Sequence, residues 1–104
     1  MHVNVTKEGQ TVFFEIIGKI DEQGAEELKK LFQQLNLTIT KEVVFNFHKV
    51  EHIGSAGIGK LLLFYKDLSV NGGIIRVEKV SNTVYELLHL VKLDTVFEIK
   101  KMYQ

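Results

Sequence analysis

Segments of two hydrophobic periodicities alternate along this chain, and that alternation limits its possible folds more than any other feature. Residues 3–8 and 11–17 alternate apolar and polar side chains on either side of Gly9, which predicts a β-hairpin. Residues 22–35 then place apolar side chains at helical spacing behind Asp21, a residue type that commonly caps helix N-termini. The change from strand to helix periodicity therefore marks where the first helix begins.

The same change repeats through the rest of the chain. Residues 42–47 include few polar side chains, which predicts a strand buried on both faces. A connection over residues 48–54 leads to a second helix, predicted over residues 55–69. The remaining predicted elements are a strand at residues 74–80, a third helix that Ser81 caps, and a short strand at residues 95–99. The order β-β-α-β-α-β-α-(β) predicts one α/β domain over residues 1–104, with a mixed β-sheet and parallel crossovers.

Composition excludes several classes of function. The 104 residues include 13 Lys plus Arg and 13 Asp plus Glu, so the formal net charge is zero. General nucleic-acid binding and polybasic membrane attachment depend on excess positive charge, so neither is expected. The absence of cysteine excludes disulfides, thiol catalysis and thiolate metal sites. The absence of cysteine also fits a cytoplasmic protein, which we expect. The longest apolar run is far below the roughly 18 residues of a membrane-spanning helix, so we expect no membrane insertion.

Three glycines and a serine separate the buried strand from the second helix, in the segment Gly54-Ser55-Ala56-Gly57-Ile58-Gly59-Lys60. This segment matches the G-x-x-x-x-G-K core of a phosphate-binding loop. However, Leu61 stands where Mg²⁺ coordination requires a Ser or Thr hydroxyl, and the apolar strand is expected to end early, near Phe47. No later strand ends in an Asp suited to hold the metal. A nucleotide-hydrolysing site is therefore disfavoured.

Two other kinds of chemistry also fit this region poorly. A nucleophile elbow requires G-x-S-x-G, but Ile53 occupies the first glycine position before Ser55. His48 and His52 are four residues apart, yet they fall at a strand end and in a connection, with Glu51 as the only nearby carboxylate. We therefore expect surface histidines, no metal or cofactor, and no catalytic site.

Ser55 allows two interpretations. A serine at a helix N-terminus exposes its hydroxyl beside unpaired backbone N–H groups, and a phosphate there gains from those groups and from the helix dipole. Phosphorylation would also bring roughly 1.5–2 negative charges to a partner-binding surface. Gly57 and Gly59 lack side chains and would let a partner come close to that surface. In the other interpretation Ser55 only caps the helix and the glycines serve tight packing. The residues alone leave both open.

The second helix carries more apolar side chains than one sheet-facing stripe needs. Its predicted buried face consists of Ile58, Leu61, Leu62, Tyr65 and Leu68. Leu63 and Phe64 widen the stripe, so we expect them, together with Ile58, to contribute to a partner-facing surface unless neighbouring elements bury the helix more fully. Phe13, Phe14 and Tyr65 are expected in the core.

These segments resemble the STAS domain family, specifically the bacterial anti-sigma factor antagonists. The family's pattern is a buried strand, here residues 43–47, and then D-S-[S/A/T]-G-[L/I]-G opening an amphipathic helix, here Gly54 to Gly59. Further matches are Gly18-Lys19-Ile20-Asp21 at the family's G-[E/D]-[L/I]-D, Asn71-Gly72-Gly73 before the fourth strand, and residues 87–97 at the final helix and its L-x-x-x-F ending. The resemblance covers nearly the whole chain. It implies a STAS-like single domain whose helices pack mainly on one face of the sheet.

The resemblance implies a binding module and not an enzyme. In that family the unphosphorylated antagonist binds an anti-sigma factor that is also a serine kinase, and the sigma factor is released. The kinase phosphorylates a serine that corresponds here to Ser55, and a PP2C-type phosphatase removes the phosphate; ATP belongs to the kinase. The implied partner-binding residues are Asp21, Gly54, Ala56, Gly57, Ile58, Gly59 and Lys60.

Two residues depart from the family's pattern. Gly54 stands where the family has Asp, and Lys19 stands where it has an acidic residue, so both changes remove negative charge near Ser55. One explanation is that the partner kinase carries compensating changes, and another is that glycine only relaxes the loop. A third is that Ser55 is no substrate, and that the chain serves another STAS assembly, such as a stressosome-like scaffold or a lipid-transport complex. The sequence leaves these three open.

Overall fold

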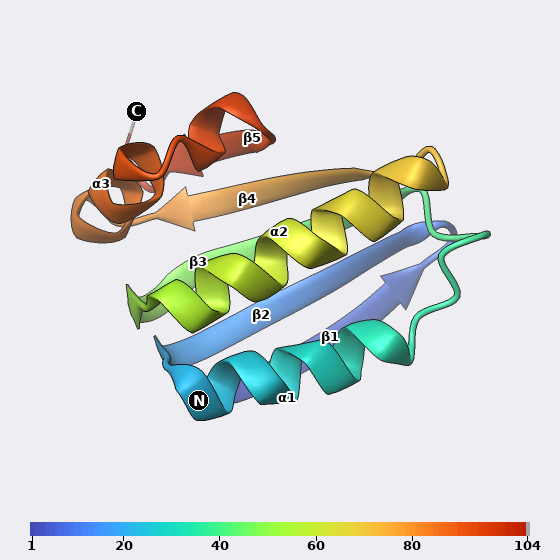
Figure 1. Cartoon of the computed structure of the whole chain (residues 1–104), viewed down its shortest axis with the longest axis horizontal. Coiled ribbons are helices and arrows are strands. Elements are labelled where there is room, and N and C mark those ends of the chain that lie inside the picture. The colour runs from blue at the N-terminus through green and yellow to red at the C-terminus, as the bar shows by residue number, and fades with distance from the viewer. Residues whose placement is uncertain (104) are drawn as a thin grey trace.

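The computed structural model describes residues 1–103, in which helices and strands alternate after an opening hairpin (Figure 1). The strands are β1 (His2–Glu8), β2 (Thr11–Ile20), β3 (Glu42–Ile53), β4 (Ile74–Val80) and β5 (Glu98–Lys101). The helices are α1 (Glu22–Gln33), α2 (Ser55–Val70), α3 (Asn82–Leu90) and the short 3-10 helix η1 (Leu93–Thr95). The predicted order of elements is therefore confirmed.

The strands form a single sheet whose spatial order, β1-β2-β3-β4-β5, is also their order in the sequence. β1 and β2 are antiparallel around Gly9, whose φ of 60° is a conformation that glycine adopts without strain. From β2 to β5 the neighbours are parallel, and each parallel connection passes through a helix. The mixed sheet with parallel crossovers is as predicted.

The helices pack mainly on one face of the sheet. α1 and α2 lie side by side over that face, and α3 lies at the carboxyl end of β4 (Figure 1). The residues of β2, β3 and β4 that point toward the helices are buried; they are Val12, Phe14, Ile16, Val43, Phe45, Phe47, Ile75 and Val77. An aromatic cluster joins the layers, because Phe14 stacks on Phe45 with ring centroids 5.2 Å apart and Phe32 of α1 stacks on Phe64 of α2 at 4.0 Å.

The opposite face of the sheet is polar along the row that contains Arg76. This side chain lies 3.3 Å from Glu42, 3.1 Å from Glu78 and 3.2 Å from Glu98. The hydrogen bond to Glu42, and then the charges of the three carboxylates, raise the pKa of the guanidinium. Phe13 lies on this face and is 37% exposed, so its expected place in the core is wrong. Strand alternation sends Phe13 and the buried Phe14 to opposite faces, and the helices cover only one of them.

Three strand predictions differ from the structure by several residues at their ends. β2 continues to Ile20 instead of ending at residue 17. β3 continues to Ile53 instead of ending near Phe47, and its last residues pair with β2, Ile53 opposite Ile20. Two shifts in the β2–β3 register interrupt the regular alternation, so residues 48–53 do not show a simple period of two. The final strand was predicted at residues 95–99, but η1 occupies 93–95 and β5 begins at Glu98. The first helix ends at Gln33, two residues earlier than expected.

Candidate functional site

The carboxyl ends of β2 and β3 bring two distant parts of the chain together. Because these neighbouring strands are parallel, Ile20 and Ile53 lie opposite each other at the same edge of the sheet. α1 begins just after Ile20, and α2 begins just after Ile53. Their first turns therefore enclose a shallow hollow, lined by Asp21, Glu22, His52, Gly54, Ser55 and Ala56.

The N-terminus of α2 differs from the prediction in which residue caps it. Gly54 is the N-cap, with φ −93° and ψ 176°, and it provides no side-chain hydrogen bond to the helix. Its N–H donates to the carbonyl oxygen of Ile20 at 3.0 Å. Ser55 is the first helical residue, so the interpretation of Ser55 as a cap is wrong. Gly54 has an extended backbone that other residues also adopt, and a Cβ here would lie 3.8 Å from the Ile20 oxygen, which leaves room for a side chain.

The hydroxyl of Ser55 is free in the part of the chain that the structure describes. The protein has three serines. Ser69 Oγ donates to the Lys66 carbonyl at 3.1 Å, and Ser81 Oγ accepts the N–H of Val84 at 3.2 Å. Ser55 is exposed, and within residues 1–103 its Oγ has no hydrogen-bond partner. It stands beside the first-turn N–H groups of α2, which have no partner within the helix.

Asp21 caps α1, as predicted. Its Oδ1 accepts the N–H of Gly24 at 2.8 Å, which satisfies one of the free donors of the first turn. The residue is exposed, and it also lines the hollow beside Ser55. The sequence places 33 positions between these two residues, so only the parallel pairing of β2 and β3 makes them neighbours.

The glycines of α2 have different surroundings. A Cβ on Gly57 would lie 2.6 Å from Ile20 Cγ2 and 3.0 Å from Ile53 Cγ1, so this glycine allows α2 to pack closely on the strand ends. A Cβ on Gly59 would meet no atom within 4 Å. Tight packing, one of the two roles considered for the glycines, therefore explains Gly57 and does not explain Gly59.

Alanine at these two positions is expected to change stability in opposite directions. Gly57→Ala should lower the free energy of unfolding by about 1–2 kcal/mol, because crowding against Ile20 and Ile53 outweighs the gain in helix propensity. Gly59→Ala should raise it by about 0.5–1 kcal/mol, because the methyl group enters open space. Urea denaturation of both variants measures these changes, and a shift of the same sign in both would contradict this assignment.

The other expected partner-binding residues lie around the start of α2 in different ways. Ala56 is partly exposed in the hollow, and Ile58 is half-buried against the core. Lys60 points toward α1, where its Nζ lies 3.5 Å from Glu26 Oε1. Lys60 therefore belongs to the contact between the two helices, on a different side of α2 from Ser55.

The outward side of α2 is apolar beyond Ser55. Ser55, Gly59 and Leu62 follow one another at helical spacing; Leu62 is 39% exposed and Leu63 is 59% exposed. Phe64 is 4% exposed and belongs to the core, so its expected place on the surface is wrong, as is the buried place of Leu62. The buried line is Gly57, Leu61, Phe64 and Leu68. The i, i+4, i+7, i+11 spacing of these four residues was the signal that could have identified it.

The structure also bears on the phosphate-binding loop and the metal site considered from the sequence. β3 reaches Ile53, directly before Gly54, which removes one objection to a phosphate-binding loop. A stronger objection replaces it, because residues 55–60 are helical and no loop is left to wrap a phosphate. His48 and His52 lie exposed on β3, and residues 1–103 hold no group of three His, Asp or Glu side chains placed to bind a metal. No helix in that range is long and apolar enough to cross a membrane.

Comparison with known proteins identifies the family. The STAS domain model matches residues 2–104. The chain belongs to the STAS domain family. Among solved structures, an anti-sigma factor antagonist from Mycobacterium paratuberculosis shares 22% identity at a TM-score of 0.83, over 95% of this chain and 84% of that one. The match confirms the STAS fold, a single mixed sheet with helices mainly on one face.

Two further proteins have this fold. Bacillus SpoIIAA in its phosphorylated form is 16% identical at a TM-score of 0.75, over 94% of this chain and 90% of that one. Unphosphorylated SpoIIAA, an anti-sigma factor antagonist, is 18% identical at a TM-score of 0.72, over 86% of this chain and 83% of that one. Mglu is 28% identical at a TM-score of 0.64 over 71% of this chain. The match spans only 18% of the length of the Mglu chain.

Proposed function

We propose that this STAS domain is a cytoplasmic anti-sigma factor antagonist that works by binding and not by catalysis. Its partner is an anti-sigma factor with serine kinase activity, which docks at the first turn of α2. Phosphorylation of Ser55 ends the complex, and a PP2C-type phosphatase restores it. The observation that carries the proposal is the Ser55 hydroxyl, exposed and without a hydrogen bond in the described residues, at the rim of the hollow that Asp21 shares.

The position of Ser55 suits a switch that acts on binding and spares the fold. A phosphate on Oγ would lie at the N-terminus of α2, where the helix dipole and the free N–H groups favour negative charge. It would also add roughly 1.5–2 negative charges beside Asp21 and Glu22, the two carboxylates that line the same hollow. Ser55 is followed on the outward side of α2 by Gly59 and Leu62, neither of which is charged. A partner that docks over this hollow and the apolar side of α2 would lose affinity when that charge appears.

The absence of an acidic residue at position 54 is compatible with this function. Gly54 caps α2 through its backbone, so the helix starts at Ser55 without an aspartate. We infer that the partner kinase reads the exposed hydroxyl and the neighbouring Asp21, and that Gly54 and Lys19 reflect a partner with less positive charge at its docking surface. SpoIIAA, which shares the fold, is known in unphosphorylated and phosphorylated forms.

Phosphate mapping tests the proposal. The protein is incubated with its cognate anti-sigma kinase and ATP, and the phosphate is located by mass spectrometry. We expect one phosphate, on Ser55, and none on the Ser55→Ala variant. Ser69 and Ser81 serve as internal controls, since both of their hydroxyls are engaged in hydrogen bonds. Phosphate found only at other residues, or none with the cognate kinase, would refute the switch.

A further inference from the structure

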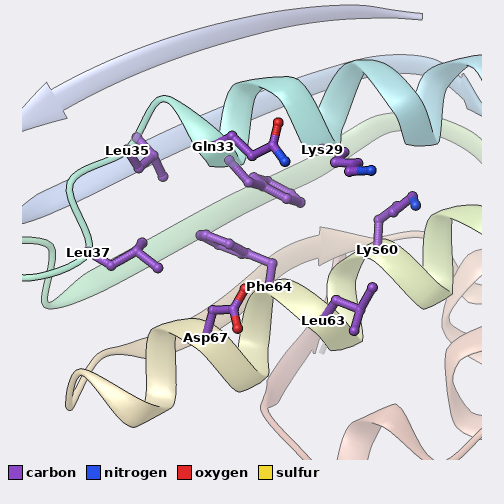
Figure 2. A pocket seen from close by; sticks show the side chains of 9 residues that line it. Lys29, Gln33, Leu35, Leu37, Lys60, Leu63, Phe64 and Asp67 are labelled. Carbon is purple, nitrogen blue, oxygen red and sulfur yellow. The ribbon is translucent and has the colours of Figure 1, made fainter.

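A groove of about 280 Å³ runs between α1 and α2 (Figure 2). Phe32 and Phe64, the stacked pair of the core, form part of its lining. Leu63 borders it from α2 and is 59% exposed. The groove therefore offers apolar surface that the described residues do not cover.

The two ends of the groove carry opposite charges. Lys29 of α1 and Lys60 of α2 face each other at one end, and Asp67 lies farther along α2 toward the other end (Figure 2). Glu26 neutralises Lys60 at 3.5 Å. Within residues 1–103, neither Lys29 nor Asp67 forms an ion pair. In that range a free cation and a free carboxylate thus lie on the two sides of Leu63.

This arrangement is complementary to itself. A two-fold axis through the groove near Leu63 would lay α2 of a second copy antiparallel to the first. Residues 60 and 67 are about 10 Å apart along the helix, so the acidic end of each copy would lie over the basic end of the other. Leu63 of one copy would meet Leu63 of its partner near the axis. Lys29 and Asp67 would then pair twice, once in each direction.

We propose that the groove between α1 and α2 is the interface of a symmetric homodimer, with Leu63 at its centre and Lys29–Asp67 pairs between copies. The two helices present a face of about 24 by 20 Å, or about 500 Å². Stable interfaces cover about 800 Å² on each partner, so this dimer is weak and is populated only at high protein concentration. The inference rests on the residues of the groove and is independent of phosphorylation at Ser55.

Sedimentation equilibrium of the purified chain, at concentrations up to about 1 mM, tests the dimer, since that range reaches weak complexes. We expect a reversible monomer–dimer equilibrium for the natural sequence. Leu63→Asp should raise the dimer dissociation constant at least about tenfold by placing two carboxylates at the axis. Leu90→Asp is the matched control, because Leu90 is 76% exposed on α3, outside the groove, and should leave the constant unchanged.

A mixing experiment tests the symmetry itself. Lys29→Asp and Asp67→Lys, prepared as separate variants, should each dimerise several-fold more weakly, because each brings like charges together. In an equal mixture, the new carboxylate at position 29 of one copy faces the new ammonium group at position 67 of the other. The unchanged Asp67 of the first copy faces the unchanged Lys29 of the second, so dimers should return to the level of the natural sequence. Circular dichroism checks that every variant is folded.

Three results would overturn the inference. They are a natural chain that stays monomeric up to about 1 mM, a mixture that associates no better than either variant alone, and an equal effect of Leu63→Asp and Leu90→Asp. If the natural chain stays monomeric and Leu63→Asp instead weakens binding to the anti-sigma kinase, the groove belongs to the kinase and the dimer is refuted.

Discussion

Ser55→Asp is expected to weaken binding to the anti-sigma kinase at least about 100-fold, because a carboxylate would be buried in the contact without a counter-charge. The free energy of unfolding should stay within about 0.5 kcal/mol of its original value, since an acidic residue in the first turn of a helix interacts favourably with the helix dipole. Isothermal titration calorimetry measures the affinity, and urea denaturation measures the stability. The combination of lost binding with a retained fold distinguishes a switch from a structural role.

Two variants control this prediction. Ser81→Asp adds the same charge at the start of another helix and retains the cap of α3, because Ser and Asp are similarly good N-caps. It should bind the kinase as tightly as the original protein. Ser55→Ala removes only the hydroxyl and should bind within about threefold, since that hydroxyl has no partner in the described residues of the free structure. Undiminished binding by Ser55→Asp, or an equal loss with Ser81→Asp, would refute the docking site.

Phe64→Ala is expected to lower the free energy of unfolding by about 3–5 kcal/mol, a large part of the roughly 5–15 kcal/mol available to a domain. Phe64 is 4% exposed, stacks on Phe32 at 4.0 Å and meets Phe45 edge-on at 6.3 Å. Its loss would leave a cavity where α1, α2 and the sheet meet. Chemical denaturation measures the change.

The neighbouring residue provides the control. Leu63 is 59% exposed, so Leu63→Ala should change the free energy of unfolding by no more than about 0.5–1 kcal/mol. A cost below about 1 kcal/mol for Phe64→Ala, or a similar cost for both variants, would mean that the two side chains do not divide α2 into a core side and a free side.

Much of the fold could be predicted from local patterns. The hairpin around Gly9, the caps Asp21 and Ser81, and β4 at residues 74–80 follow from side-chain periodicity and from residue types that act within a few positions. The end of β3 could not be predicted in this way. Its last residues are held by β2, and the two register shifts hide the alternation that normally reveals a strand.

Residue faces were predicted less well than elements. Leu62, Leu63 and Phe64 are adjacent and all apolar, so any of them could have been expected to point inward. The choice depends on where α1 lies, because Phe32 supplies the ring on which Phe64 stacks. Phe13 was misplaced for a related reason: periodicity shows that a strand has two faces but does not show that only one of them carries helices.

Some features of the candidate site could likewise be predicted from local sequence, and others depend on the tertiary structure. The sequence by itself determined the residue types of the Gly54–Lys60 segment, its place between a strand and a helix, and the resemblance to the STAS family that the family match confirms. The tertiary structure decided that Gly54 and not Ser55 caps α2, that Gly57 is crowded and Gly59 open, and that Asp21 is a neighbour of Ser55. Periodicity and capping act over a few residues and are visible in sequence. Packing and the pairing of parallel strands join residues far apart in the chain, and only the folded arrangement sets those distances.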